Sequence, residues 1–250
     1  FFILHEGAVE MSDKTLNEIT YKKMTKEGIL SSNKTEWSGF TDKYWMTTLI
    51  AEPGKFFNSK KEFNSDQNRY LIEMKLGTQE INPNSRESIT TFLFAGAKEV
   101  STIKSYEKNL EIYNFIDSVD WGWFFFLTKP IFSLLEIFNS YIGNMGWSII
   151  LLTLFMKTLL LPLAYKSFVS MSKLKKLQPE MEKIKERAGD DRVKLQQEMM
   201  NLYKTQKVNP AAGCLPILLQ IPIFFSLYKV LFVTIEMRHA PFIGWIKDLS

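Results

Sequence analysis

The stretch GWSIILLTLFMKTLLLPLAY, residues 146–165, holds one charged side chain, Lys157, among leucines, isoleucines and phenylalanine. Twenty helical residues extend about 30 Å, which is the thickness of the hydrocarbon core of a bilayer. The stretch therefore predicts a transmembrane helix. Because Lys157 lies slightly past its middle, the sequence also predicts a charge inside the membrane, and charges in that position are usually functional.

Hydration decides the state of Lys157. Placing a lysine at the centre of a membrane helix costs about 2.5–3.5 kcal/mol, and neutralising it at pH 7 costs about 4.6 kcal/mol. Since the two costs are comparable, a lipid-facing Lys157 sheds its proton or distorts the bilayer, whereas a Lys157 in a wet cavity stays charged. A carboxylate about 4 Å from the charged form gains on the order of 4 kcal/mol before desolvation.

The charges on either side of this stretch differ. The whole chain of 250 residues has a formal net charge of +4. Residues 1–120 carry 15 Lys/Arg and 18 Asp/Glu, a net charge of −3, whereas residues 166–207 carry 11 and 6, a net charge of +5. The composition therefore predicts a soluble domain followed by a membrane region, with the basic segment between two apolar runs.

Residues 1–115 predict the C-terminal part of an antiparallel β-sandwich. Apolar and polar side chains alternate in KYWMTTLIA (43–51), RYLIEMKLG (69–77) and SITTFLFAG (88–96), and NPNS (82–85) predicts a turn between the last two. We find no glycine-rich phosphate loop, metal-ligand spacing or nucleophile motif there, and His5 is expected to be a packing or surface residue. The domain is expected to bind or to support, without catalytic residues, metal or cofactor.

Residues 121–143 predict an amphipathic helix that lies flat on the membrane. Lys129, Ser133, Glu136 and Ser140 recur at helical spacing and form one polar stripe. Pro130 suits the first helical position, which leaves about 20 Å of helix, too short to cross a bilayer. Trp121 and Trp123 are expected at the headgroup level. A buried helix of the soluble domain is the alternative interpretation.

Residues 166–209 predict a coiled-coil-like hairpin of two amphipathic helices. Gly189 ends the first helix, and the aspartates at 190 and 191 begin the second. The excess of Lys and Arg beside both apolar runs places this hairpin in the cytoplasm and the β-domain outside. The apolar positions that recur at three- and four-residue spacing are Met171, Leu174, Leu177, Met181, Ile184, Ala188, Leu195, Met199 and Leu202.

Residues 211–235 predict a second transmembrane helix, and residues 236–250 the start of the following outer loop. The second span contains Pro222 and the amide of Gln220, which a membrane tolerates where neighbouring helices or water satisfy the polar groups. Lys229 lies close to the outer end, where its long side chain can reach the headgroups. We therefore assign it no role.

Taken together, these features resemble the YidC family of membrane protein insertases. The resemblance covers essentially the whole chain and is carried by GDDRVKLQQEMMNLYKTQKVNPAAGCLPILLQIPIFFSLYKVL (189–231), EMRHAPFIGWIKDLS (236–250), WSGFTDKYW (37–45) and FAGAKE (94–99). It implies a multi-domain α+β membrane protein of the bacterial inner membrane that is multi-pass, with a periplasmic β-domain. The sequence is expected to be an internal fragment that lacks the first span and the last three spans of the family.

The resemblance implies a function and a site. Family members insert nascent inner-membrane proteins and help them fold through a hydrophilic groove that bears a positive charge, alone or with the Sec translocon. Lys157 occupies the position of that charge, where Gram-negative relatives commonly have arginine. Thr153, Gln220 and Phe224 match positions that line the groove or the substrate path. The implied partners are nascent membrane proteins, membrane lipids and, through the hairpin, the ribosome or targeting factors, with no specific nucleic-acid motif.

Two other classes of function stay open from the residues alone. In a membrane protease, Lys157 would act as the base for Ser148 or Thr153, but Ser148 lies about 13 Å away along the helix axis. In a two-span sensor, the outer domain would bind a ligand and the hairpin would signal. No kinase or receiver motif is visible, and a sensor gives no reason for a lysine at the middle of the membrane.

Overall fold

The computed structural model describes residues 4–189, 191–206, 208, 213 and 215–249, with side chains omitted at 215 and 216. The chain divides into two compact units. The first unit is Phe1–Lys129 together with Tyr228–Ser250, and the second is Pro130–Leu227. Each unit is described in turn.

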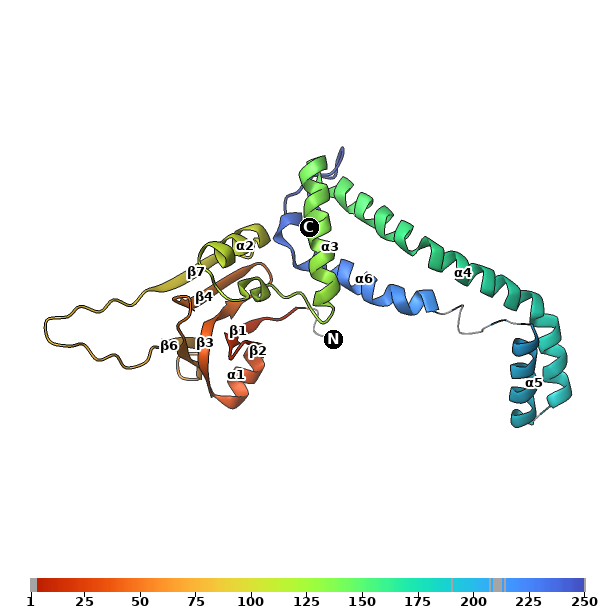
Figure 1. The fold of residues 1–250 in the computed structure, drawn as a ribbon, viewed down its shortest axis with the longest axis horizontal. Helices are drawn as coiled ribbons and strands as arrows, with labels where there is room; N and C mark the ends of the chain where they lie inside the picture. Colours follow the sequence, from red (N-terminus) through yellow and green to blue (C-terminus); the bar gives the residue numbers. More distant parts are fainter. Residues whose placement is uncertain (1–3, 190, 207, 209–212, 214, 250) are drawn as a thin grey trace. The chain divides into compact units, whose positions relative to one another are not determined.

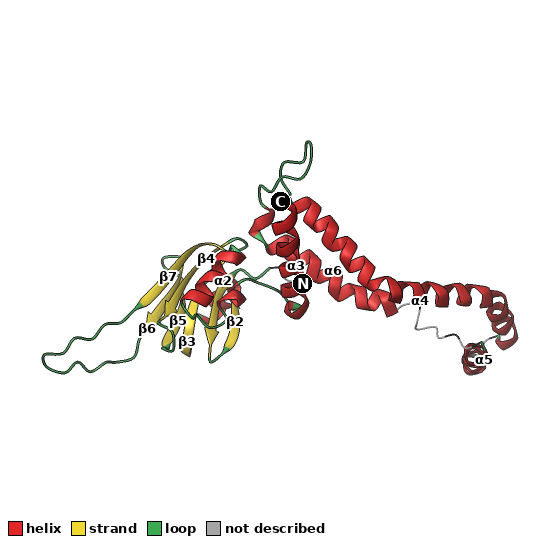
Figure 2. Ribbon diagram, turned by 45° about the horizontal axis from the view of Figure 1, so that its top comes forward, coloured by secondary structure: helices red, strands yellow, loops and turns green. Residues whose placement is uncertain are grey.

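The first unit contains an antiparallel sheet, and the predicted class of an antiparallel β-sandwich domain is confirmed (Figure 2). All of its described strands join one hydrogen-bonded network in the order β2-β1-β3-β4-β7, with β5 paired to β3 and β6 paired to β5. The strands are β1 (Gly7–Ser12), β2 (Thr15–Thr20), β3 (Ile29–Thr41), β4 (Trp45–Ala51), β5 (Phe57–Asn64), β6 (Arg69–Lys75) and β7 (Thr91–Ala97).

The long strand β3 holds the two arms of the sheet together. Its second half, from Trp37 to Thr41, pairs with β4, whereas its first half, from Ile29 to Thr35, pairs with β5. Between the two arms, the register with β5 shifts between Ser32 and Thr35. A bulge of this kind bends a strand and increases its twist, so one strand can serve two arms that diverge.

The predicted alternation of faces is confirmed in β4 and β6. In β4, Met46, Thr48 and Ile50 are buried while Trp45 is exposed. The turn at residues 82–85 also forms, with the Ser85 N–H donating to the Asn82 carbonyl at 3.0 Å. It does not join β6 to β7 as a hairpin, because β6 pairs with β5 and β7 with β4. Residues 76–90 form a long extended loop instead (Figure 1).

The sequence of β5 lacks the apolar alternation expected of a half-buried strand, because two of its inward-facing side chains are polar. Lys61 is fully buried and forms an ion pair with Glu10 of β1, whose other carboxylate oxygen accepts a hydrogen bond from Ser32 Oγ at 2.6 Å. Ser59 donates to Ser38 Oγ at 3.0 Å. Desolvation lowers the pKa of Lys61, and the Glu10 carboxylate acts against that shift.

This unit also contains the helices α1 (Tyr21–Glu27) and α2 (Val100–Asn109) and the 3₁₀ turn η1 (Phe115–Ser118). Trp37 is fully buried beside η1. Its indole N–H donates to the Tyr113 carbonyl at 3.0 Å, and its ring meets Phe115 edge to face at 5.7 Å. His5 is buried, with Nε2 3.0 Å from the Ala8 carbonyl oxygen, as expected for a packing histidine.

Lys98 is another buried lysine of the first unit. Its Nζ donates to Thr41 Oγ1 at 2.9 Å, and only 2% of the residue is exposed. Burial lowers the pKa of Lys98 to about 8, although the carboxylates of Asp120 and Asp42 act in the opposite direction. Burial of the protonated Lys98 side chain therefore lowers the free energy of unfolding of the domain.

Helix α3 (Phe125–Ile142) differs from its prediction in two respects. It begins five residues before Pro130 (130 − 125), so this proline lies inside the helix, and its 18 residues extend about 27 Å. The Phe124 carbonyl starts it by accepting from the Leu127 and Thr128 N–H groups at 2.8 Å. The two tryptophans also differ: Trp121 is buried and donates to the Ile116 carbonyl, whereas Trp123 is 94% exposed; their position at the headgroup level stays a prediction.

Helix α4 (Met145–Ala188) is continuous through the predicted end of the first span. Asn144 caps it by accepting from the Trp147 N–H, and Pro162 and Pro179 lie inside it. Within the described residues, α4 is the one helix that is long and apolar enough to cross a membrane. Helix α6 (Leu215–Val233) has a shorter apolar stretch, Ile217–Val233, and several residues of the predicted span 211–235 lie outside the described part of the chain.

The end of α4 and helix α5 (Arg192–Thr205) form the predicted hairpin, side by side in Figures 1 and 2. Gly189 ends α4 with a φ of 51°, and the Asp191 carboxylate caps α5 by accepting from the Val193 and Lys194 N–H groups at 3.1 and 3.0 Å. Residue 190 lies outside the described residues. Leu177 and Ala188 are buried, and Tyr203 Oη contacts Met181 Sδ, so most of the predicted stripe packs inward; Met171 is exposed.

A substitution at Gly39 tests the junction of β3 and β4. A Cβ on Gly39 would lie 1.9 Å from the Thr47 carbonyl oxygen and 2.6 Å from Thr48 Cα, both backbone atoms. Gly39→Ala should therefore lower the free energy of unfolding by more than about 2 kcal/mol, measured by urea denaturation with circular dichroism. Gly77→Ala is the control, because a Cβ there meets nothing within 4 Å. Equal midpoints for the two variants would contradict this packing.

A pH series tests the burial of Lys98. Because its folded pKa is about 8 and its unfolded pKa about 10.4, the unfolded chain binds more protons between these values. Stability should thus rise with pH across that window, by on the order of 3 kcal/mol in total. Lys98→Met should remove this rise in the melting temperature, measured from pH 7 to 10. The exposed Lys108→Met should keep it, and parallel curves for wild type and Lys98→Met would contradict the assignment.

Candidate functional site

Lys157 lies on an exposed, apolar part of α4. Its side chain is exposed and makes no hydrogen bond or ion pair with the described residues. Leu154 and Leu161 beside it are 61% and 63% exposed. The cation thus stands alone on a surface of aliphatic side chains, which is an arrangement that water does not favour unless the surface contacts lipid or another apolar partner.

Thr153 lies one helical turn before Lys157 and therefore on the same face of α4. Its Oγ1 donates to the Ile149 carbonyl at 2.7 Å. Ser148 is fully buried and donates to the Asn144 carbonyl at 2.8 Å. Both hydroxyl groups are thus bound to the backbone of α4, and neither bonds to Lys157. The geometry gives no support to a Ser/Lys or Thr/Lys catalytic dyad.

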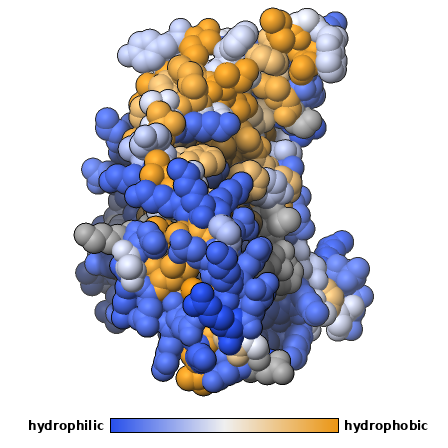
Figure 3. Space-filling view, turned by 90° about the vertical axis from the view of Figure 1, so that its right-hand side faces the viewer, coloured by the Kyte–Doolittle hydropathy of each residue, from blue (hydrophilic) through white to orange (hydrophobic). Residues whose placement is uncertain are grey.

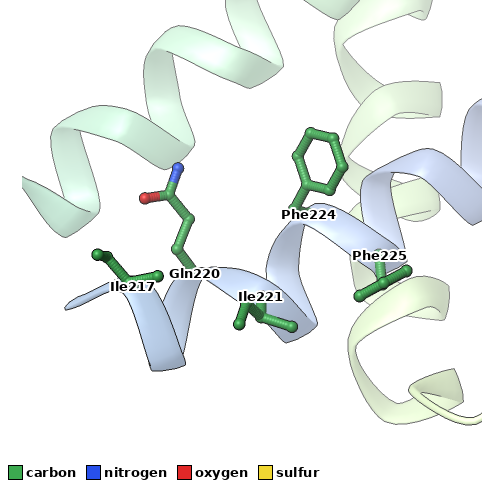
Figure 4. A pocket seen from close by; sticks show the side chains of 5 residues that line it. All are labelled: Ile217, Gln220, Ile221, Phe224 and Phe225. Atoms are coloured by element: carbon green, nitrogen blue, oxygen red, sulfur yellow. The ribbon is translucent and has the colours of Figure 1, made fainter. Parts of the chain in front are cut away.

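Gln220 and Phe224 form a similar pair on α6. They are one helical turn apart, both exposed, and they project from the same side of the helix (Figure 4). Together with Ile217, Ile221 and Phe225 they line an open depression of about 190 Å³. All five residues belong to α6, so this depression is a feature of one helix surface and not an enclosed cavity.

Apolar and polar surfaces are separated along the second unit. Apolar side chains gather toward the top of the face shown in Figure 3, and hydrophilic side chains cover most of its lower part. Exposed aromatic and aliphatic residues of the apolar helices include Ile150, Phe155, Leu159, Leu218 and Phe225. This separation matches the hydropathy of a helix that leaves an apolar layer and continues into water.

The site offers recognition groups more than reactive groups. One ammonium, one amide and one hydroxyl lie on apolar helices, and they can attract a carboxylate or a polar segment in an apolar setting. Within the described residues, no group of three or more His, Cys, Asp or Glu side chains could hold a metal ion. The structure places Thr153 with Lys157 on α4 and Gln220 with Phe224 on α6; no described contact joins the two pairs.

The structure also shows a contact that the sequence did not predict. Lys229, which we expected to reach the headgroups without a further role, forms an ion pair with Asp120 at 2.7 Å, and both side chains are 12% exposed. The two residues are far apart in the chain, and neither lies in a recognisable motif. Single-sequence patterns carry no signal for a pair of this kind.

Comparison with known proteins gives consistent matches. The YidC periplasmic domain family model matches residues 1–134, and the 60Kd inner membrane protein family model matches residues 137–250. A protein of Paracoccus denitrificans described as "Membrane protein insertase YidC" is 55% identical over 259 residues, covering 100% of this chain and 41% of that protein. A protein of the same description from Dinoroseobacter shibae is 58% identical over 260 residues, covering 100% and 43%.

The chain thus spans less than half the length of the curated relatives it matches. A solved structure, "Active YidC insertase crystal structure with the first transmembrane domain resolved", matches with a TM-score of 0.44 at 19% identity, covering 98% of this chain and 67% of that chain. The periplasmic-domain family model alone covers more than half of the 250 residues. The chain therefore belongs to the YidC family, whose members include inner membrane proteins with a periplasmic domain.

Proposed function

We propose that the protein to which this chain belongs inserts nascent proteins into the bacterial inner membrane and assists their folding. The relatives described as membrane protein insertases, at 55% and 58% identity across the whole chain, support this activity. In this proposal, the apolar helices α4 and α6 contact the incoming segment, and Lys157 attracts the acidic or polar residues that must cross. The chain acts through binding and not as an enzyme.

The exposed position of Lys157 is the observation that carries the proposal. A lysine on an apolar helix with no described anion beside it is available to an anion from outside. In a partly hydrated groove, a substrate carboxylate about 4 Å away gains on the order of 4 kcal/mol before the costs of desolvation. Lysine supplies this attraction as a point charge, without the planar fork that lets arginine bind a carboxylate through two hydrogen bonds.

The same proposal gives the protein a topology. The first part of α4 crosses the membrane, the hairpin of α4 and α5 lies in the cytoplasm, α6 returns across the membrane, and the β-domain lies in the periplasm. The basic composition of residues 166–207 supports the orientation, because positive charges beside membrane spans favour the cytoplasmic side. Helix α3, with an exposed Trp123 beside it, lies along the outer interface.

The hairpin is the proposed docking element for the ribosome or targeting factors, and the Sec translocon is a proposed partner for larger substrates. Lysines on the exposed surface of α4 beyond the membrane span carry most of the positive charge of the hairpin, among them Lys173, Lys175 and Lys176. Such a surface attracts the phosphate backbone of ribosomal RNA and anionic lipid headgroups without sequence selectivity.

Substitutions at Lys157 test the charge. In the full-length protein, Lys157→Arg should keep insertion, because the charge survives. Lys157→Ala should slow insertion of a substrate with an acidic translocated segment by about tenfold, which corresponds to 1.4 kcal/mol, and should affect the same substrate without its acidic residues much less. The measurement is the initial rate of insertion into vesicles, followed by protease protection.

Lys166→Ala is the matched control, since it removes an exposed lysine nine positions later on the same helix, past the apolar stretch. It should leave both substrates unaffected. An arginine variant as damaged as the alanine variant would point to a proton-transfer role and against electrostatic attraction, because arginine stays protonated. Equal alanine defects for acidic and acid-free substrates would contradict the proposed recognition of carboxylates.

The hairpin is tested by charge reversal. Changing Lys173, Lys175 and Lys176 together to Glu should weaken co-sedimentation with ribosomes and make the remaining binding less sensitive to salt, because fewer counterions are released. Changing the exposed Lys22, Lys23 and Lys26 of α1 to Glu is the control with the same change of net charge. Ribosome binding reduced equally by both triple variants would show that total charge, and not the hairpin, is responsible.

A further inference from the structure

The last turns of α6 are fastened to the β-domain by an ion pair with a complete set of partners. Lys229 Nζ lies 2.7 Å from Asp120 Oδ2. The same oxygen accepts the His5 backbone N–H at 2.8 Å, and Oδ1 accepts the Gly122 N–H at 3.1 Å. The Asp120 carboxylate therefore has three donors. We call this group of Asp120, Lys229 and the two backbone N–H groups the clamp.

The stem of Lys229 is also held in place. Gly122 has a φ of +73°, and a Cβ on it would lie 3.3 Å from Lys229 Cε and 3.6 Å from Cδ and Cγ. Glycine at this position thus allows the lysine stem to lie against the backbone that follows Asp120, in a conformation that other residues rarely adopt. The clamp is a packed contact as well as an electrostatic one.

Residues around Lys229 support the same contact. Val230, Val233 and Met237 are buried. Further along, the Glu236 carboxylate accepts the N–H of Val100 at 3.1 Å, at the beginning of α2. Lys43, in the turn before β4, places its ammonium 4.0 Å from the centre of the Phe232 ring. The end of α6 and the turn η3 (Ile235–Met237) are thus part of the β-domain unit and not the free start of a loop.

The direction of the clamp on α6 matters for the proposed site. Lys229 follows Gln220 by nine positions (229 − 220), which is a rotation of about 180° around a helix, and follows Phe224 by five, a rotation of about 140°. Lys229 therefore points away from the side that carries Gln220 and Phe224. A contact on the back of a helix can fix its rotation and its axial position while it leaves the front face open.

We propose that the clamp is a positioning device, through which the β-domain sets the rotation and the depth of α6 and so directs Gln220 and Phe224 toward the substrate. This role rests on the proposed insertase function, with Asp120 and Lys229 as positioning residues that do not themselves touch the substrate. A nearly buried ion pair suits the task, because removing one partner strands a charge, whereas removing both is much less costly.

The test combines a structural and a functional measurement in the full-length protein. The variants are Asp120→Asn, Lys229→Met, the double variant and Lys229→Arg. Hydrogen exchange at residues 228–234 should become about tenfold faster in Asp120→Asn and in Lys229→Met, because each variant leaves one charge without its partner. The acceleration should be smaller in the double variant, and exchange should change little in Lys229→Arg. Exchange in the middle of α4, at residues 150–160, should change much less, because these residues belong to the other compact unit.

The functional measurement is photocrosslinking of a nascent chain from position 224 on α6 and from position 153 on α4. Lys229→Met should reduce the crosslink from position 224 at least threefold and leave the crosslink from position 153 nearly intact. Lys229→Arg should keep the crosslink from position 224 close to its wild-type level. Lys55→Met is the matched control, since it removes an exposed ion pair with Glu52 on the same domain, and it should change neither measurement.

The two measurements separate the possible failures. Unchanged hydrogen exchange at residues 228–234 in Lys229→Met would overturn the clamp, whatever the insertion activity. Faster exchange with undiminished crosslinking from position 224 would overturn its positioning role. A wild-type protein that neither crosslinks nor inserts nascent chains would contradict the proposed function, and the exchange data would then still decide whether the clamp holds α6.

Discussion

The cost of removing a charge from water governs four lysines of this protein, and each meets that cost differently. Lys61 is fully buried and paired with Glu10. Lys98 is buried beside a hydroxyl group, so its pKa is lowered to about 8. Lys229 pairs with Asp120, whose carboxylate has further backbone donors. Lys157 has no described partner and stays exposed on an apolar helix. The three buried or nearly buried lysines have their hydrogen-bond or charge partners inside the fold, and the exposed one is the candidate for recognition.

The same contrast separates the two ends of α6. At one end, Val230 and Val233 are buried and Lys229 is paired, so the helix is part of the β-domain unit. Toward the other end, Gln220 and Phe224 are exposed on an apolar surface with a shallow depression. A single helix thus joins a firmly packed segment to an open one. This division is what a binding surface on a supported element requires, because recognition groups need both access and a fixed position.

Local patterns predicted those features that depend on neighbours in sequence. The alternation of Met46, Thr48 and Ile50 gave the buried face of β4, and Gly189 with Asp191 gave the turn of the hairpin, because strand faces and helix caps follow from residue identity within a few positions. Strand β5 escaped detection because its inward Lys61 is balanced by Glu10, which lies 51 positions away. The predicted helix start at Pro130 was wrong, because the residues before the proline are helical too and extend α3 by more than one turn.

Long-range contacts limited the prediction of the site in the same way. The apolar run around Lys157 identified the candidate charge directly, whereas the roles of Trp121 and Lys229 depended on partners elsewhere in the fold. Their expected place at the headgroup level followed from the general preference of tryptophan and lysine for that region. Nothing in the sequence indicated the Ile116 carbonyl and the Asp120 carboxylate as their partners in the fold.

The continuity of α4 has a mechanical consequence. Its 44 residues extend about 66 Å, roughly twice the hydrocarbon thickness of a bilayer, so in the proposed topology an arm of similar length to the span would project beyond it without a break in the backbone. A rod of this kind transmits torque, and a partner that turns the hairpin also turns the face that bears Lys157. Pro162 and Pro179 are the positions where this helix would bend most readily, because each lacks the N–H that would tie it to the preceding turn. Bending at Pro162 would swing the arm against the span, whereas bending at Pro179 would move only the tip.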